Sequence, residues 1–130
     1  MKRTLLSLVI AWLALSACGG GGDGEAESAA SAPLVGNVPG GEEVFMGTCI
    51  KCHGDNATGI EGLGTNLTIS QFIRDRTDAE LIEYIKVGRE MNDPLNTTGI
   101  AMPPYGANPM LTDQDLANVV AYLRTVQQEP

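Results

Sequence analysis

Cys49-Ile50-Lys51-Cys52-His53 is the segment that decides the fold of this 130-residue chain. It has the form C-x-x-C-H, in which two thiols separated by two residues can add to the two vinyl groups of one haem. The histidine directly after the second thiol then lies against the iron and binds it. The sequence therefore predicts one covalently attached haem c per chain, held by Cys49 and Cys52, with His53 as the proximal axial ligand.

Two other uses of this spacing are a redox dithiol and half of a zinc site. A structural zinc site needs four ligands, usually Cys or His, whereas the chain holds three cysteines and one histidine. The third cysteine, Cys18, has a separate explanation at the N-terminus. A thioredoxin-like dithiol would lie beside a β-α-β pattern, and none is visible nearby. Haem attachment is therefore the favoured interpretation of the motif.

The N-terminal segment, residues 1–17, has the pattern of an export signal. Residues 1–3, Met-Lys-Arg, form a short basic region, and residues 4–17 form a mostly apolar run that is shorter than the ~20 apolar residues needed to span a bilayer. The run ends in Leu-Ser-Ala directly before Cys18, which resembles the lipobox of bacterial lipoproteins. That resemblance implies lipid attachment at Cys18 and a membrane-anchored protein facing the periplasm or the outside of the cell. The alternative is an ordinary secretory signal followed by an incidental cysteine.

Residues 19–40 have the composition of a linker, since Gly, Ala and Ser dominate and no amphipathic period is present. A flexible chain of about 22 residues reaches roughly 25 Å on average. The sequence thus predicts three parts: a lipoprotein signal peptide at 1–17, a lipidated cysteine with a flexible linker at 18–40, and a folded domain at 41–130.

The chain is acidic, with a formal net charge of −8. This charge argues against nucleic acid as a partner and against electrostatic adsorption to anionic lipid. It favours redox donor and acceptor proteins that carry basic docking patches, although acidity also serves simply to keep an exported protein soluble. No nucleophile, general base or substrate pocket is readable, so we expect no small-molecule substrate and an electron-transfer protein rather than an enzyme.

Three helices are predicted, and no segment shows the alternation of a strand. The first begins at about Glu42, with two glutamates in its first turn, and runs into the haem motif. The second covers 78–87 and starts with a capping box formed by Thr77 and the glutamate three residues later. The third covers about 113–127, with Thr112 as N-cap and apolar residues at positions i, i+3, i+4 and i+7.

The second axial ligand decides whether such a haem is open to small molecules or serves as an electron carrier. Because the chain has one histidine, two histidine ligands are excluded within it, and methionine is the favoured ligand type. Met46 lies on the helix leading into the motif and cannot easily reach the opposite haem face. Met102 precedes two prolines that stiffen the loop predicted at 93–109. We therefore expect Met102 to be the second iron ligand, with Met91 and Met110 as alternatives.

Taken together, residues 41–126 resemble a small mono-haem class I cytochrome c. The resemblance rests on the Gly-Glu-Glu-Val-Phe run at 41–45, the attachment motif, the Met-Pro-Pro loop and the Tyr-Leu-Arg ending at 122–124. It implies an all-α fold with three main helices and irregular loops around one covalent haem. The first and last helices would cross near Gly41 and Tyr122, leaving the haem edge exposed on one face.

The chain departs from this family at two places. Many members have Gly-Pro-x-Leu after the motif, where the proline carbonyl accepts a hydrogen bond from the ligating histidine; here Thr65 stands at the proline position and can still offer its carbonyl. The mature chain also lacks tryptophan, so the haem propionates need other partners, for which Tyr105, Arg89 and Asn92 are candidates.

The function that follows is single-electron transfer between membrane-bound or periplasmic redox proteins through a low-spin haem c. One alternative is a fixed electron-transfer subunit of a larger membrane oxidoreductase. A less favoured alternative is a ligand-binding haem protein with an open sixth coordination site.

Overall fold

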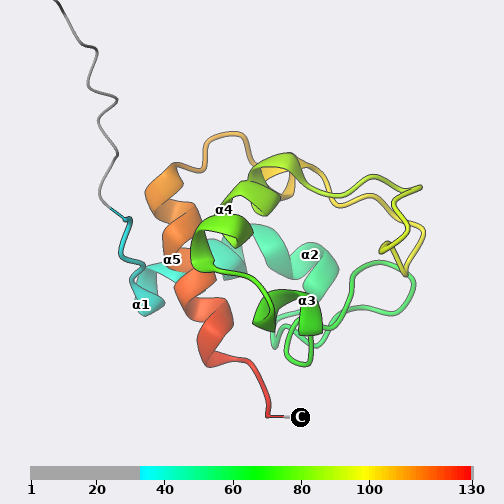
Figure 1. Ribbon diagram of the computed structural model, residues 1–130, viewed down its shortest axis with the longest axis horizontal. Helices are drawn as coiled ribbons and strands as arrows, with labels where there is room; N and C mark the ends of the chain where they lie inside the picture. Colours follow the sequence, from blue (N-terminus) through cyan, green and yellow to red (C-terminus); the bar gives the residue numbers. More distant parts are fainter. Residues whose placement is uncertain (1–32, 130) are drawn as a thin grey trace, which may run out of the picture. The chain divides into compact units, whose positions relative to one another are not determined.

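Helices and irregular loops make up residues 33–129, the part of the chain that this computed structural model describes (Figure 1). The predicted signal peptide, Cys18 and most of the predicted linker lie outside these residues. Within 33–129 no extended strand occurs, and the only bridges are isolated pairs, Ile60 with Gly64 and Arg89 with Met102. Among the described helices, none combines the length and apolarity that crossing a membrane would need.

The first helical run begins earlier than the sequence suggested. It consists of α1 (Val38–Val44), a π-helical turn (Phe45–Cys49) and α2 (Ile50–His53). Asn37 is the N-cap, and its side chain accepts a hydrogen bond from the Gly40 N–H at 2.8 Å. The helix therefore starts inside the segment expected to be linker. The prediction that two glutamates occupy its first turn is wrong, because that turn contains no acidic residue.

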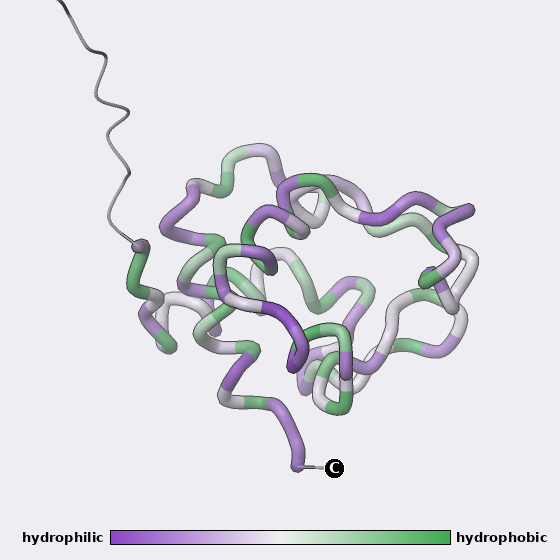
Figure 2. The backbone as a smooth tube through the Cα atoms, viewed as in Figure 1, coloured by the Kyte–Doolittle hydropathy of each residue, from purple (hydrophilic) through white to green (hydrophobic). Residues whose placement is uncertain are grey.

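The two other predicted helices are confirmed. α4 (Asp78–Val87) has the expected capping box, in which the Thr77 N–H donates to Glu80 Oε2 at 2.7 Å. α5 (Asp113–Thr125) has Thr112 as its N-cap, as expected, and ends two residues before the predicted end; Asp115 completes a second capping box that was not predicted from the sequence. Hydrophilic and hydrophobic colours alternate along these amphipathic helices in Figure 2, and the end of the tail after α5 is hydrophilic.

These two capping boxes should make the folded state sensitive to acid. Hydrogen bonds from Thr77 lower the pKa of Glu80 below its ordinary 4.5, and those from Thr112 lower the pKa of Asp115 below its ordinary 3.8. A carboxyl group whose pKa is lower in the folded state than in the unfolded state stabilises the folded state at pH values above its unfolded-state pKa. This stabilisation is lost as the pH falls through the folded-state pKa. We expect the double variant E80Q/D115N to show a shallower fall in unfolding free energy from about pH 5 to 3 by urea titration. E43Q changes an exposed glutamate in α1 and is the control. A fall in unfolding free energy between these pH values as steep for E80Q/D115N as for E43Q would contradict the prediction.

Two short helices were not expected from the sequence: α3 (Gln71–Arg74), capped by Ser70, and the 3-10 turn Pro104–Ala107. α3 and the start of α4 are held to α5 by Arg124. Its Nη1 donates to the Ile73 carbonyl at 2.6 Å and its Nε to Asp78 Oδ1 at 2.9 Å. Arg124, on α5, thus fixes the connection between α3 and α4, which lies far from it in sequence.

α1 lies across α5 (Figure 1). Gly41 is buried there, and the rings of Phe45 and Tyr122 pack with centroids 5.2 Å apart. The chain just before α1 also lies on α5, since Gln114 Nε2 donates to the Val35 carbonyl at 3.0 Å. The Asn37 N–H donates to Asn118 Oδ1 at 2.9 Å. The largest fully buried side chains are Phe45, Leu116, Val119 and Val120.

Candidate haem-binding site

Two cavities that share part of their walls, of about 200 and 280 Å³, lie beside the C-x-x-C-H motif. Both are lined by Cys49, His53, Arg89 and Met102. The larger one has an apolar wall of side chains from α3, α4 and α5, including Ile73, Ile85, Leu116, Val119 and Leu123. An apolar hollow of this kind, with a few polar groups at defined places, suits a largely apolar cofactor.

The two cysteines of the motif lie at the end of the first helical run. Cys49 closes the π-helical turn and Cys52 is on α2, so one continuous run of helix fixes their spacing. They are not joined in a disulfide. Burial, followed by the neighbouring Cys52, raises the pKa of the Cys49 thiol to about 11. Both side chains line the smaller cavity, which is the geometry that attachment of one group through two thiols requires.

His53 is oriented by the loop that follows the motif. Its Nδ1 donates to the Thr65 carbonyl at 3.0 Å, the contact expected from the sequence at this position. With the proton on Nδ1, Nε2 keeps its lone pair free for a metal. Burial lowers the pKa of His53, opposed by the Thr65 hydrogen bond, and so favours the neutral ring that a metal ligand must have.

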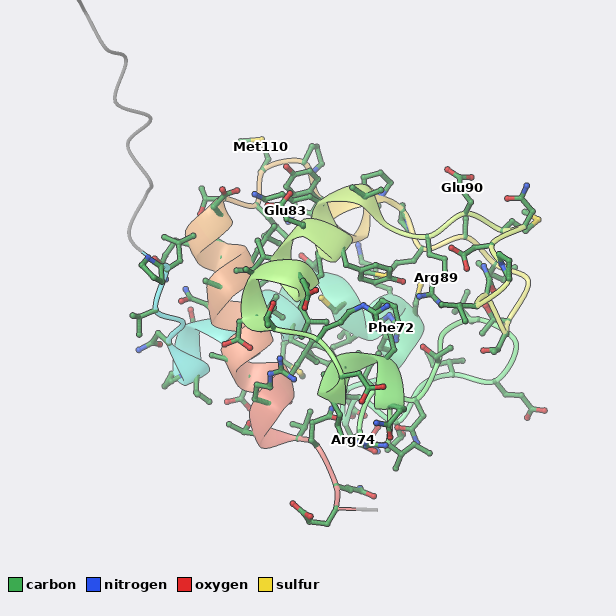
Figure 3. All side chains as sticks on the ribbon, in the orientation of Figure 1. Phe72, Arg74, Glu83, Arg89, Glu90 and Met110 are labelled. Carbon is green, nitrogen blue, oxygen red and sulfur yellow. The ribbon has the colours of Figure 1, made fainter. Side chains whose placement is uncertain are left out.

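The four methionines of the described residues differ clearly in position. Met102 is half-buried and lines both cavities. Met46, Met91 and Met110 are 43%, 62% and 82% exposed and line neither. Figure 3 shows Met110 on the loop before α5, pointing outward. The structure therefore brings together His53 and Met102, and leaves the alternative methionines outside.

Arg89 is the candidate propionate partner that the structure brings to the cavities. Its guanidinium group lies over the ring of Phe72, 4.6 Å from the centroid, and over that of Tyr84 (Figure 3). Nη1 donates to the Leu95 carbonyl at 2.6 Å, whereas Nε is buried with no partner within residues 33–129. Buried donors are rarely left unpaired, and a guanidinium N–H is well suited to a carboxylate. This unpaired donor fits a haem propionate.

The remaining sequence candidates separate into those at the site and those away from it. Tyr105 lines the larger cavity. Asn92 is exposed and lines neither cavity. Sequence reasoning missed Phe72 and Tyr84, whose ring centroids are 4.6 Å apart and which support Arg89. Neither residue belongs to a motif, so their role depends on the fold.

Comparison with known proteins agrees with this site. The family model described as cytochrome c matches residues 39–127. The chain is 31% identical over 93 residues to the cbb3-type cytochrome c oxidase subunit FixP of Sinorhizobium medicae, which covers 72% of this chain and 31% of that subunit. It is 32% identical over 90 residues to the subunit CcoP of Rubrivivax gelatinosus, covering 69% and 26%. The chain thus spans less than a third of the length of these relatives. No solved structure gives a significant match.

Proposed function

Because this chain belongs to the cytochrome c family, we propose that it is a single-electron carrier tethered to a bacterial membrane by lipid at Cys18. It is an electron-transfer protein with a covalently bound haem c. The observation that carries the proposal is that His53 and Met102 line the same two cavities. The haem, once attached to Cys49 and Cys52, supplies an iron that alternates between its ferrous and ferric states.

His53 and Met102 are proposed as the two axial ligands. With both in place the iron offers no open position to small molecules, which is the condition for a carrier rather than a ligand-binding protein. The Thr65 carbonyl keeps Nε2 of His53 directed as a ligand. Leu63, Leu95 and Ile100 are exposed at the rim of the smaller cavity. They would form the small apolar contact through which a partner approaches, as is typical of transient redox complexes.

Replacing Arg89 by glutamine tests its proposed pairing with a propionate. Loss of the cation leaves a buried carboxylate unpaired beside the haem, which favours the ferric state. We expect the reduction potential to fall by roughly 30 to 60 mV at 59 mV per decade, and to vary more with pH around neutrality. Arg76→Gln is the matched control, because Arg76 lies over the same Phe72 ring but lines neither cavity. Equal potentials for the two variants would exclude the pairing.

Cell fractionation tests the lipid tether. Cys18 lies outside the described residues, so its modification rests on the lipobox pattern alone. A diacylated cysteine gives stable membrane association, whereas a protein without the lipid has no such anchor. We expect the native protein to sediment with membranes and to be released by detergent, and C18S to carry haem yet remain in the soluble fraction. Native protein found in the soluble fraction would exclude the tether.

A second candidate function is that of a fixed subunit of a membrane oxidoreductase. It is favoured by the similarity to the oxidase subunits named FixP and CcoP. Purification in mild detergent at low and high salt distinguishes a free carrier from a fixed subunit. A fixed subunit elutes in a stoichiometric complex at both salt concentrations. A carrier that docks through its acidic surface elutes alone at high salt, and its exchange with a basic partner slows as ionic strength rises.

A further inference from the structure

Both backbone polar groups of Met102 are paired with Arg89, which lies two residues after the end of α4. The Arg89 N–H donates to the Met102 carbonyl at 2.8 Å, and the Met102 N–H donates to the Arg89 carbonyl at 2.9 Å. These two bonds satisfy both backbone polar groups of Met102. The direction in which its side chain leaves the backbone is thereby tied to α4 rather than to its own loop.

Gly88 brings the end of α4 against this methionine. Its N–H donates to the Tyr84 carbonyl at 2.7 Å, and its φ is +75°. A Cβ at this position would lie 2.2 Å from the Met102 carbonyl oxygen and 2.8 Å from the carbonyl carbon of Pro103. Both neighbours are backbone atoms, so they cannot move aside as a side chain could. The close approach of Met102 to α4 therefore requires glycine at 88.

Asn96 links the beginning and the end of the loop that connects Arg89 to Met102. Its Nδ2 donates to the Glu90 carbonyl at 3.0 Å and to the Ile100 carbonyl at 2.8 Å. Its Oδ1 accepts from the N–H groups of Thr98 and Gly99. Glu90 directly follows Arg89, and Ile100 lies just before Met102. One amide side chain thus braces the loop next to the Arg89–Met102 pair.

We propose that Gly88 and Asn96 are positioning residues that hold Met102 in place as the second axial ligand, an inference that rests on the proposed ligation by Met102. Residues 90–101 contain no helix or strand and would otherwise leave the methionine free to withdraw. A ligand already held in its bound position binds more tightly, because less conformational freedom is lost on binding. The hydrogen bonds of Asn96 and the close approach at Gly88 both supply that order.

Asn96→Asp is the first test, with Asn92→Asp as its matched control. Aspartate keeps the shape and the accepting oxygen, but it replaces two donated hydrogen bonds by a carboxylate facing two carbonyl oxygens. Asn92 lies in the same loop, is exposed, and makes no side-chain hydrogen bond within the described residues, so N92D adds the same charge without breaking a contact. In the haem-loaded protein we expect N96D to lose much of the weak red absorption band of methionine-ligated ferric haem. Ferrous N96D should bind carbon monoxide at least about tenfold faster than N92D.

Gly88→Ala is the second test, with Gly62→Ala as its control. Gly62 has a similar φ of +71° but nothing within 4 Å of its Cβ position, so G62A adds a methyl group at positive φ without a clash, whereas the methyl group of G88A meets the backbone of Met102 and Pro103. We expect G88A to lose the red band and G62A to keep it. Because this readout is spectroscopic, it separates positioning from a general loss of stability, which thermal unfolding measures in parallel.

The outcomes distinguish this inference from the ligand assignment on which it rests. If M102A loses the band while N96D and G88A keep it and are merely less stable to heat, the positioning role is excluded and the ligand assignment stands. If M102A keeps the band, the assignment fails and the inference with it. Should N96D fail to fold, hydrogen exchange in the native protein decides. We expect the amides of Arg89 and Met102 to be as protected as those of α5, and exchange as fast as at Met91 would overturn the proposal.

Discussion

Met102→Ala is expected to open the iron to external ligands while the helices remain folded. Met102 lines both cavities, and alanine cannot reach a metal from the same backbone position. The variant should lose the red absorption band, bind carbon monoxide rapidly when ferrous, and have a lower reduction potential. A fall on the order of 100 mV or more is expected, since the identity of the axial ligands sets haem potentials over a range of about 0.8 V. Absorption spectroscopy and redox titration measure these changes.

Met110→Ala is the matched control for this experiment. Met110 is 82% exposed and lines neither cavity, so the same loss of a thioether there should leave the spectrum and the potential unchanged. If M110A loses the band and M102A keeps it, the ligand is Met110 and the loop before α5 must move on haem attachment. A spectrum that is the same for both variants and the native protein would exclude both methionines.

Gly41→Ala is expected to destabilise the domain by about 3 kcal/mol or more, a large value for the addition of one methyl group. A Cβ at this position would lie 1.9 Å from the Asn118 carbonyl oxygen and 2.9 Å from Tyr122 Cβ. α1 and α5 would have to separate at their crossing, and the packing of Phe45 against Tyr122 would loosen with them. Urea unfolding of the haem-loaded protein, followed by far-ultraviolet circular dichroism, measures the effect.

Gly47→Ala is the control, and its expected effect on the unfolding free energy has the opposite sign. Gly47 lies in the same helical run, is exposed, and has nothing within 4 Å of its Cβ position. Replacing glycine by alanine in a helix reduces the freedom of the unfolded chain and should stabilise the protein by about 0.5 to 1 kcal/mol. A destabilisation of similar size in both variants would mean that the crossing at Gly41 has no special role.

Local signals made the helices at 78–87 and 113–125 predictable. Thr77 with Glu80, and Thr112 before its acidic first turn, satisfy the first N–H groups of their helices within a few residues. The start of α1 could not be predicted in the same way, because its first residues, Val-Pro-Gly-Gly, have the composition of a linker. Its glycines serve a contact with α5, far away in sequence. Asn37 followed by Pro39 was the local signal that could have identified this helix.

The residues of the site also differ in how far local sequence predicts them. Cys49, Cys52 and His53 form a motif whose chemistry is contained in five consecutive residues, and Met102 was marked by the prolines after it. The role of Arg89 could not be read with the same clarity. It depends on the rings of Phe72 and Tyr84 and on a carbonyl from Leu95, which only the folded chain brings together. The predicted lipid at Cys18 remains a prediction from sequence.

The described chain just before α1 lies against one side of α5. Gln114 and Asn118, which hold Val35 and Asn37, share one face of α5 at helical spacing. Leu116, Val119 and Leu123, which line the larger cavity, lie about half a turn around the same helix. Val35 and Asn37 therefore lie on the side of α5 that faces away from the larger cavity. In the proposed tethered carrier, a partner that docks at the cavities would leave the contacts of Val35 and Asn37 with α5 undisturbed.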